Sequence, residues 1–227
     1  MRINKFLSRA GICSRREAKD LLLAKKITLN DEIVLLPATE VKLSDIVKYN
    51  GKKVEIKDLT IFLYYKPVGY LTTKKDPQNR KTIYDNLPNT LNNFLTVGRL
   101  DINSEGLLLL TNDGEYKRFL ELPHNKIPRT YKVRIYGRFN EKHKKAIEKG
   151  VKVENVFYKA KSLSIIKIGV NSWLEITLEE GKNREIRKIL GHFGYQVNRL
   201  IRTSYGKYSL GSLKAGEYEE TDNKYSL

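Results

Sequence analysis

The sequence predicts an α+β protein built on a mixed, mainly antiparallel β-sheet with flanking helices. Helical and strand-like patterns both recur along its 227 residues, but they do not alternate as regular βαβ units. Two turn signals, Asn30-Asp31 and Asn50-Gly51, each separate short apolar runs and predict antiparallel hairpins. A clean apolar–polar alternation over 129–136 predicts a longer strand.

The N-terminal part predicts a small module of two helices and two hairpins. Apolar residues at helical spacing over 2–10 are followed by Gly11, a natural helix stop. The run 14–17, Ser-Arg-Arg-Glu, is a capping box for a second helix that reaches about Ala24. We place the end of this module near residue 57, so the first predicted domain is 1–57.

The second predicted domain spans 58–220. Its first strand covers 61–65 and ends sharply at Lys66-Pro67-Val68-Gly69, since proline fixes φ and glycine permits a turn. The segment 74–93 is polar and poorly defined, with one short helix expected near 82–87. Further elements are expected as strands at 107–110, 129–136, 151–159, 162–168, 173–178 and 197–202, and as helices at 115–122, 140–149 and 183–193, the last capped by Asn183. We expect the tail 221–227 to be disordered.

The strongest global signal is the net charge of +17, with a pI near 9.7. A polyanionic partner, nucleic acid before a membrane surface, is the natural interpretation. The alternative is a lysine-rich composition without a partner. The basic residues argue against it because they concentrate in two blocks: residues 1–26 hold eight Lys or Arg against two acidic residues, and 181–208 hold seven against one.

Several function classes lack their residue patterns. The single cysteine, Cys13, allows no internal disulfide and favours the cytoplasm, and no apolar run approaches the ~20 residues of a membrane span. The three histidines are far apart, so no metal cluster is expected. No phosphate-binding glycine loop or serine nucleophile elbow is present either. We therefore expect no metal, no cofactor and no membrane.

One stretch, 97–114, dominates the remaining chain. It frames a single carboxylate, Asp101, with Arg99 two residues before it and with Gly98 and Gly106 on either side. Four leucines, 107–110, follow directly and must be buried. This pattern predicts a rigid core strand that presents a short polar loop.

Residues 1–48 resemble the S4 RNA-binding module. The resemblance is carried by the runs 2–7, 14–18 and 27–30, with Gly11 between the helices. It implies a basic helix face that docks RNA mainly through phosphate contacts and shape. The alternative is a basic helical hairpin that only keeps the protein soluble.

The run from Gly98 to Gly114 resembles the catalytic motif of pseudouridine synthases. The order and spacing fit most closely the branch that modifies single sites in bacterial ribosomal RNA and carries an S4 module in front. Supporting matches are Lys66-Pro67-Val68-Gly69, Arg129-Thr130-Tyr131, 180–188, and 200–216. One departure is Tyr65, where the family usually has asparagine.

The resemblance implies that the N1–C1′ bond of a flipped-out uridine is broken and a C5–C1′ bond is made, without a cofactor. It assigns catalysis to Asp101, as a nucleophile or as a base towards the ribose, and the sequence leaves both open. Arg99 would help hold the nucleotide. Its guanidinium, adjacent to Asp101, would also favour the charged form of that carboxylate. Tyr131 would stack on the uracil, although a core aromatic is the alternative, and Arg187 would pair with Asp101. Gly98 and Gly106 would let the nucleotide approach the backbone.

The RNA-contact candidates are basic residues of the two charged blocks. They are Arg2, Lys5, Arg9, Arg15, Arg16, Lys19, Lys25, Lys26, Arg184 and Lys188. The expected partner is ribosomal RNA, with large-subunit RNA favoured over small-subunit RNA, either free or within an assembly intermediate, and we expect a monomer. Two rivals remain: an S4-type assembly or regulatory factor without catalysis, and a nonspecific DNA-binding protein.

Overall fold

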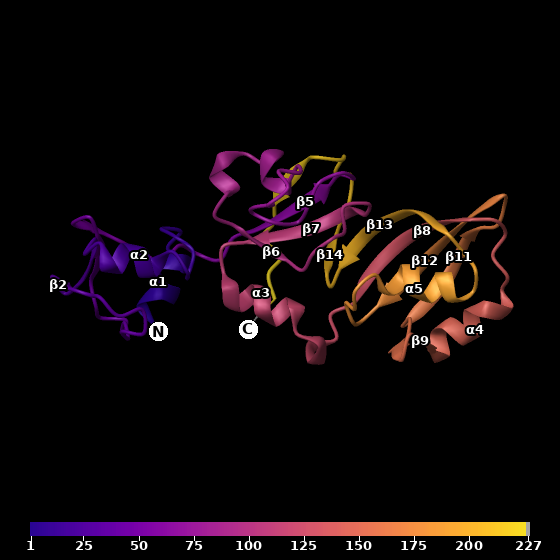
Figure 1. Ribbon diagram of the computed structural model, residues 1–227, viewed down its shortest axis with the longest axis horizontal. Helices are drawn as coiled ribbons and strands as arrows, with labels where there is room; N and C mark the ends of the chain where they lie inside the picture. Colours follow the sequence, from indigo (N-terminus) through magenta and orange to yellow (C-terminus); the bar gives the residue numbers. More distant parts are fainter. Residues whose placement is uncertain (226–227) are drawn as a thin grey trace.

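A computed structural model describes residues 1–225 and leaves 226–227 outside the described part. The molecule is elongated, with the small N-terminal module at one end and a larger domain beside it (Figure 1). The larger domain holds a nine-stranded sheet in which, within residues 1–225, only the β7–β13 pair is parallel. The predicted α+β class with a mixed, mainly antiparallel sheet is confirmed.

The N-terminal module has the predicted two helices and two hairpins. Its elements are α1 (Ile3–Arg9), α2 (Ala18–Leu23), β1 (Ile27–Leu29), β2 (Glu32–Ile33), β3 (Val47–Tyr49) and β4 (Lys52–Lys53), and its sheet has the order β2-β1-β3-β4. Asn30, Asp31, Asn50 and Gly51 all have positive φ, as type I′ turns require. A closed apolar core, which includes Ile3, Leu7, Leu22 and Ile27, fixes both helices on the sheet.

The large sheet has the strand order β11-β12-β8-β13-β7-β5-β15, with β14 on β13 and β6 on β7. Its strands are β5 (Ile61–Lys66), β6 (Leu95–Val97), β7 (Glu105–Thr111), β8 (Arg129–Tyr136), β11 (Ser162–Lys167), β12 (Asn171–Leu178), β13 (Val197–Tyr205), β14 (Tyr208–Ser209) and β15 (Tyr218–Glu220). The helices are α3 (Gly114–Glu121), α4 (Lys142–Lys149) and α5 (Glu185–His192), with 3-10 turns η1 (Ile83–Asp85), η2 (Asn89–Leu91) and η3 (Pro123–Asn125).

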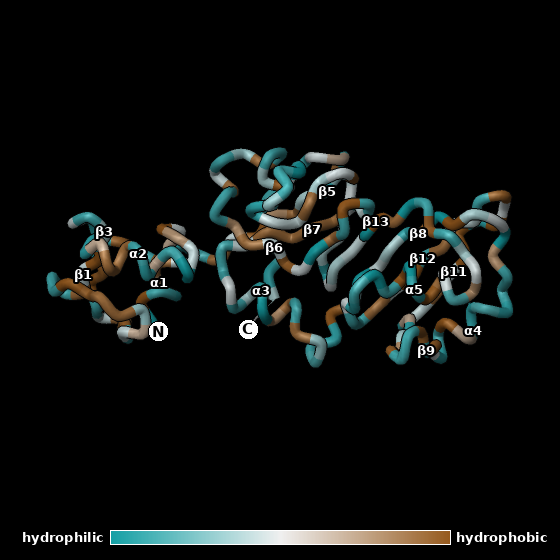
Figure 2. The backbone as a smooth tube through the Cα atoms, viewed as in Figure 1, coloured by the Kyte–Doolittle hydropathy of each residue, from teal (hydrophilic) through white to brown (hydrophobic). Residues whose placement is uncertain are grey.

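Strand β7 lies between two apolar cores, and all seven of its residues are buried. Leu108 and Leu110 belong to the core that also contains residues of α4 and α5, whereas Leu107 and Leu109 belong to the core that contains residues of α3. Because successive side chains of a strand point to opposite faces, a strand buried on both faces must be apolar at every position. This explains the continuous leucine run, which is part of the hydrophobic band across the middle of the domain (Figure 2).

Two local expectations are corrected. The strand expected at 151–159 is a separate hairpin of β9 (Val151–Val153) and β10 (Val156–Tyr158), because Glu154 and Asn155 form a positive-φ turn. Helix α5 begins at Glu185 without a cap from Asn183, since Arg184 has a left-handed φ of 51° and the Glu185 carboxylate accepts from the Lys182 N–H instead.

The tail predicted to be disordered is described up to residue 225, and Tyr225 contacts the larger domain. The Tyr225 N–H donates to the Tyr116 hydroxyl at 2.7 Å, and the Tyr225 hydroxyl accepts from the Lys207 N–H at 2.9 Å. Residues 226–227 of that prediction lie outside the described residues. Among the described helices, none is long and apolar enough to cross a membrane.

Candidate active site

A cleft of about 600 Å³ opens beside the loop that carries Asp101. Four parts of the chain line it: the loop from Gly98 to Ser104, α3 with the turn η3, the strands β8 and β13, and the segment 180–186 that leads into α5. The Asp101 side chain is 39% exposed and therefore accessible from the cleft. The structure thus brings together the central stretch and the later basic segment, which are about 80 residues apart in the sequence.

Lys66 anchors this loop from below. It ends β5 and is fully buried, and its ammonium donates to three carbonyl oxygens: Asp101 at 3.2 Å, Ser104 at 2.9 Å and Pro67 at 2.9 Å. Burial lowers its pKa to about 8, while the nearby Asp101 and Glu105 oppose that fall. A cation placed under the loop in this way fixes its backbone at Asp101, the predicted catalytic residue, and at Ser104.

Other backbone groups of the loop are held as firmly. The Gly98 N–H donates to the Glu121 carboxylate at 2.6 Å, and the Leu100 carbonyl accepts from the Thr72 hydroxyl at 2.8 Å. The Ile102 carbonyl accepts from the Gly69 N–H at 2.8 Å. Since Lys66, Gly69 and Thr72 lie within one short segment, the turn after β5 is the loop's main support. The loop is rigid because most of its backbone is hydrogen-bonded to neighbours.

Tyr65, the departure from the family pattern, has its own partner. Its hydroxyl donates to Glu105 at 2.8 Å, and Arg199 contacts the same carboxylate through Nε at 2.6 Å and Nη2 at 3.2 Å. Burial alone would raise the pKa of Glu105, but these hydrogen bonds hold it below its usual range. The substituted tyrosine therefore fixes Glu105, the first residue of β7 after the loop.

The arginine nearest Asp101 is not the one that the sequence predicted. Arg184 Nη1 lies 3.6 Å from Asp101 Oδ2, and the backbone of Arg184 has the left-handed φ described above. Arg187 instead donates to the carbonyls of Val197 at 2.9 Å and Asn103 at 3.0 Å. The expected pairing of Arg187 with Asp101 is thus not seen, and Arg187 ties α5 to the loop through its backbone. Burial lowers the pKa of this guanidinium, and the neighbouring Arg184 adds to that effect.

Arg99 and Tyr131 both line the cleft, as their predicted roles require. Arg99 is exposed, whereas Tyr131 is 9% exposed and also belongs to the apolar core beneath it. The two interpretations of Tyr131, cleft wall and core aromatic, therefore both apply: the ring is fixed by packing while it borders the cleft.

Two cleft arginines were missed by sequence reasoning. Arg129 and Arg202 are 6% and 2% exposed, and both guanidinium groups lie against the Tyr205 ring, at 4.7 and 5.1 Å from its centre. Arg129 donates to the Glu179 carbonyl and the Tyr205 hydroxyl, and Arg202 Nε donates to the Leu107 carbonyl. The alternation along the strand was the available signal, since it places Arg129 and Tyr131 on one face of β8. In the structure Tyr131 pairs with Arg202 of β13. In the sequence, Arg129 stands out only as part of the run Arg129-Thr130-Tyr131.

Gly106 serves packing rather than access to the cleft. Its φ is +103°, and a Cβ there would lie 2.3 Å from the Arg202 carbonyl oxygen. The glycine is therefore required where β7 and β13 pair in parallel, and the expected approach of a nucleotide at this position is wrong. Gly98 does line the cleft, and a Cβ there would meet only the Tyr205 ring at 3.9 Å.

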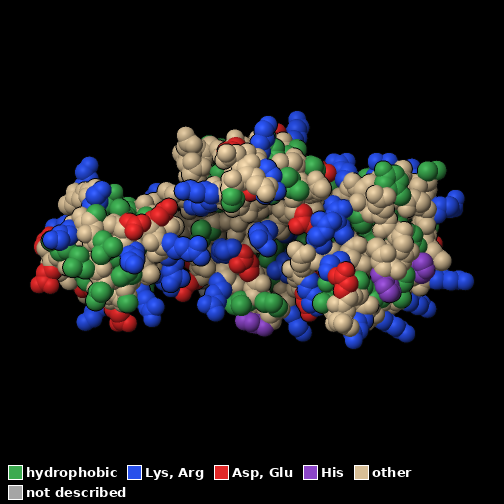
Figure 3. All heavy atoms as spheres, viewed as in Figure 1, with side chains coloured by type: hydrophobic (Ala, Val, Ile, Leu, Met, Phe, Trp, Pro, Cys, Tyr) green, Lys and Arg blue, Asp and Glu red, His purple; other side chains and the backbone are tan. Residues whose placement is uncertain are grey.

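The predicted RNA-contact residues divide into free and paired groups. Seven are exposed: Arg2, Arg15, Arg16, Lys19, Lys25 and Lys26 of the N-terminal module, and Arg184, whose guanidinium lies 3.6 Å from Asp101. Lys5 and Arg9 form ion pairs with Glu115 and Asp113 of the larger domain, and Lys188 pairs with Glu154 at 2.6 Å. On the face shown in Figure 3, Lys and Arg side chains gather along a band from the junction with the N-terminal module across the middle of the larger domain.

Comparisons with known proteins agree with this arrangement. A family model described as RNA pseudouridylate synthase matches residues 60–192, and one described as S4 domain matches residues 1–47. The chain belongs to the RNA pseudouridylate synthase family. The synthase therefore acts on RNA and is an enzyme, and its N-terminal module is an S4 domain.

Relatives of this synthase resemble it over nearly the whole chain. An uncharacterized RNA pseudouridine synthase of Rickettsia felis is 44% identical over 225 residues, which cover 98% of this chain and 97% of the relative. Ribosomal large subunit pseudouridine synthase B of Pasteurella multocida is 37% identical over 230 residues, with 97% of this chain and 67% of the relative covered. A crystal structure of pseudouridylate synthase matches with a TM-score of 0.69 and 25% identity, and covers 97% of this chain and 96% of that one.

The cleft offers this synthase no group of metal ligands in the described residues: residues 1–225 contain no set of three or more His, Cys, Asp or Glu side chains placed to hold a metal ion. What the cleft does offer is the accessible Asp101 carboxylate with guanidinium groups around it and a tyrosine ring on the wall.

Proposed function

We propose that this synthase isomerises one uridine of ribosomal RNA, with large-subunit RNA as the preferred substrate, and that Asp101 is the catalytic group. The observation that carries the proposal is the placement of Asp101: its carboxylate faces the cleft from a loop that Lys66, Gly69 and Thr72 hold rigid. Two relatives, from Pasteurella multocida and Haemophilus influenzae, are named ribosomal large subunit pseudouridine synthase B, which supports the choice of RNA.

The proposed reaction breaks the N1–C1′ bond of the uridine and forms a C5–C1′ bond. The hydrogen on C5 leaves as a proton and N1 gains a proton, so the product is an isomer of the substrate and no oxidant or reductant is consumed. Asp101 acts either by attack on C1′ or by removal of a ribose proton, and its accessible carboxylate can do both. A rigid loop favours either route because the carboxylate needs no reorganisation at the moment of reaction.

The other cleft residues receive roles that follow from their positions. Tyr131 stacks on the flipped uracil, a contact that contributes on the order of 1–3 kcal/mol when a base meets an aromatic ring. Arg99 and Arg184 hold the nucleotide and its phosphates beside Asp101, since both are exposed at the cleft. Arg187 positions the loop through the Asn103 carbonyl.

RNA reaches the cleft along the exposed basic surface of the S4 domain. The contact residues are Arg2, Arg15, Arg16, Lys19, Lys25 and Lys26, together with Arg184 at the cleft and Lys188 on α5. We place the reaction in the cytoplasm, carried out by a monomer on ribosomal RNA that is either free or within an assembly intermediate. The single cysteine is consistent with a reducing compartment.

The target is found by mapping pseudouridines in ribosomal RNA from cells that lack the gene. Carbodiimide treatment and primer extension, before and after incubation with the purified protein, should show one new stop, in large-subunit RNA. A new stop only in small-subunit RNA would overturn the choice of subunit. No new stop in ribosomal RNA, with tight RNA binding retained, would favour an assembly factor without catalysis.

A further inference from the structure

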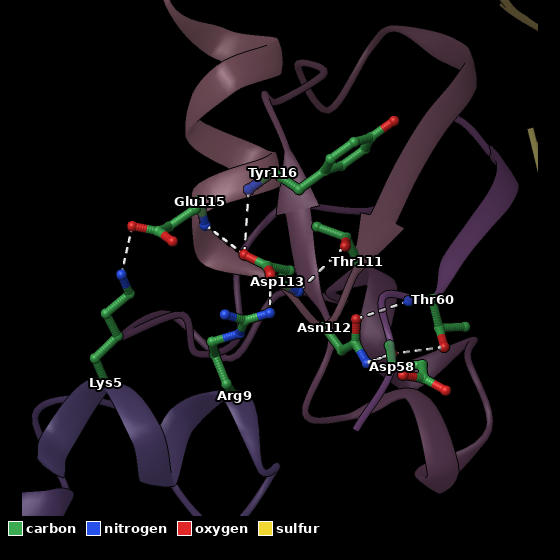
Figure 4. Close-up of polar contacts among 9 residues, drawn as sticks. All are labelled: Lys5, Arg9, Asp58, Thr60, Thr111, Asn112, Asp113, Glu115 and Tyr116. Carbon is green, nitrogen blue, oxygen red and sulfur yellow. Dashed lines mark hydrogen bonds and ion pairs between the residues drawn. The ribbon is translucent and has the colours of Figure 1, made fainter. Parts of the chain in front are cut away.

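The turn that follows β7, from Thr111 to Glu115, lies outside the catalytic cleft yet contacts the S4 domain and the interdomain linker (Figure 4). It is the last part of the central sequence stretch, Thr-Asn-Asp-Gly, and catalysis gives it no role. In Figure 4, Glu115 and Asp113 point towards Lys5 and Arg9 of α1, whereas Asn112 points towards Asp58 and Thr60 of the linker.

Asp113 makes the most buried of these contacts. Arg9 Nη2 lies 2.6 Å from Asp113 Oδ2, and the two side chains are 25% and 6% exposed. The other carboxylate oxygen accepts from the N–H groups of Glu115 and Tyr116, so Asp113 also caps α3. An ion pair that is largely removed from water and fixed on one side by backbone donors is stronger than an exposed one.

Two further contacts complete the junction. Lys5 forms an ion pair with Glu115, one turn of α1 before Arg9. Asn93 of the larger domain donates to the Gly11 carbonyl at 3.0 Å, just after the end of α1. The larger domain therefore contacts α1 at Lys5, at Arg9 and after its end at Gly11, which fixes the helix against rotation as well as displacement.

Asn112 holds the linker at the same place. Its side-chain amide donates to the Asp58 carbonyl at 2.7 Å and accepts from the Thr60 N–H at 2.9 Å. Where the chain enters the larger domain, it is therefore hydrogen-bonded to the same turn that contacts α1.

Strand β7 connects this turn to the catalytic loop. It is seven residues long, buried throughout, and runs from Glu105, next to the loop, to Thr111, next to the docking contacts. At ~3.4 Å per residue the six steps from Glu105 to Thr111 span about 20 Å. A strand buried between two cores does not bend easily, so the two ends keep a fixed separation.

We propose that the turn 111–115 is a docking seat for the S4 domain, and that β7 sets the distance between the RNA anchored on that domain and Asp101, and so decides which uridine enters the cleft. Lys5 and Arg9 then act in docking and not as phosphate ligands. The proposal rests on the proposed function for its effect on site choice, but the docking itself needs no RNA.

The test uses full-length protein with two kinds of change: Asp113→Asn, and an exchange of charges between Lys5 and Glu115. Asparagine still caps a helix, so Asp113→Asn removes the charge that holds Arg9 and keeps α3. Lys5→Glu and Glu115→Lys each break the outer pair, and the double variant Lys5→Glu/Glu115→Lys restores it with reversed charges. Lys19→Glu is the matched control, since this exposed lysine of the same domain has no partner on the larger domain among the described residues.

Domain arrangement is read by small-angle X-ray scattering without RNA, and site choice by the carbodiimide map. We expect a larger radius of gyration for Asp113→Asn and for each single exchange variant, together with a drop in modification of the principal uridine by about five- to thirtyfold relative to neighbouring uridines, as the loss of 1–2 kcal/mol would give. The double variant should return both readouts towards wild type, whereas Glu115→Lys should not rescue Lys19→Glu.

Unchanged scattering for Asp113→Asn would overturn the docking seat. A double variant that modifies the principal uridine no better than Lys5→Glu alone would return Lys5 to the phosphate contacts and also overturn it. Failure of the proposed function is distinct, because it would leave wild type without a principal uridine while the scattering differences persist.

Discussion

Lys66→Met tests whether the buried ammonium under the catalytic loop positions Asp101. Methionine matches the lysine in length and has no charge, so the substitution removes the donor without opening a large cavity. The carbonyls of Pro67 and Ser104 would each lose the Lys66 donor, whereas the Asp101 carbonyl would still accept from the Ser104 N–H at 3.0 Å.

The effects on stability largely cancel. Two buried carbonyls without a donor cost about 2–6 kcal/mol in total. Burial lowers the pKa of Lys66 from 10.5 to about 8, and that difference corresponds to about 3 kcal/mol of destabilisation that methionine would relieve. We therefore expect the net change in the free energy of unfolding to lie between a rise of about 1 kcal/mol and a fall of about 3 kcal/mol. Activity has no such compensation, because displacement of a catalytic group by about 1 Å costs on the order of 100-fold in rate.

The assay measures single-turnover pseudouridine formation and RNA affinity for wild type, Lys66→Met and Lys152→Met, an exposed lysine of β9 that serves as the control. We expect kcat to fall about 100-fold for Lys66→Met with affinity unchanged within a few-fold, and no effect of Lys152→Met. A Lys66→Met enzyme that is folded and turns over within twofold of wild type would refute the positioning role.

Three other predictions concern stability and RNA binding. Gly106→Ala should lower the free energy of unfolding by several kcal/mol, because its Cβ would lie 2.3 Å from the Arg202 carbonyl oxygen at a φ of +103°. A melting temperature within 2 °C of wild type, which corresponds to about 0.5–1 kcal/mol, would contradict this. Because the pKa of Lys66 is lower in the folded than in the unfolded protein, the folded protein binds fewer protons between pH 8 and 10.5. The free energy of unfolding of wild type should therefore rise across that window relative to Lys66→Met, by about 3 kcal/mol in all. If urea denaturation gives the same difference between the two proteins at pH 7.5 and at pH 10, the result would argue against it. Replacing both Arg15 and Arg16 with glutamine should weaken RNA binding and lower the slope of log affinity against log salt by about 1–2, and an unchanged slope in filter binding would exclude phosphate contacts there.

Turn chemistry and periodicity made most of the fold predictable. Asn30-Asp31 and Asn50-Gly51 form the predicted turns because few other residue pairs adopt positive φ at both positions. The turn at Glu154-Asn155 was missed because glutamate is not a typical turn residue there, and the helix cap at Asn183 was misplaced because the left-handed Arg184 shifts the start of α5. Both errors concern local backbone conformations that neighbouring segments impose.

The sequence predicted the central residues of the candidate site, but not the contacts of several residues around them. Asp101, Arg99 and Tyr131 could be found because their spacing matches a known motif, and all three line the cleft. The resemblance gave the pairing with Asp101 to Arg187 and an RNA contact to Arg184, because both lie near the start of α5 and only the geometry shows that Arg184 faces Asp101. Lys5 and Arg9 looked like phosphate ligands because a sequence shows the charge of a side chain but not its partner in another domain.

The most direct test of the account measures release of tritium from RNA that carries [5-³H]uridine. Formation of a C5–C1′ bond expels the hydrogen on C5, so the label enters water only when the isomerisation takes place. Wild type should release the label from one uridine per RNA, and Asp101→Asn should release none above background while it binds the RNA with the same affinity. Release by Asp101→Asn at a rate similar to wild type would contradict the central claim that this carboxylate, held on its rigid loop, performs the chemistry.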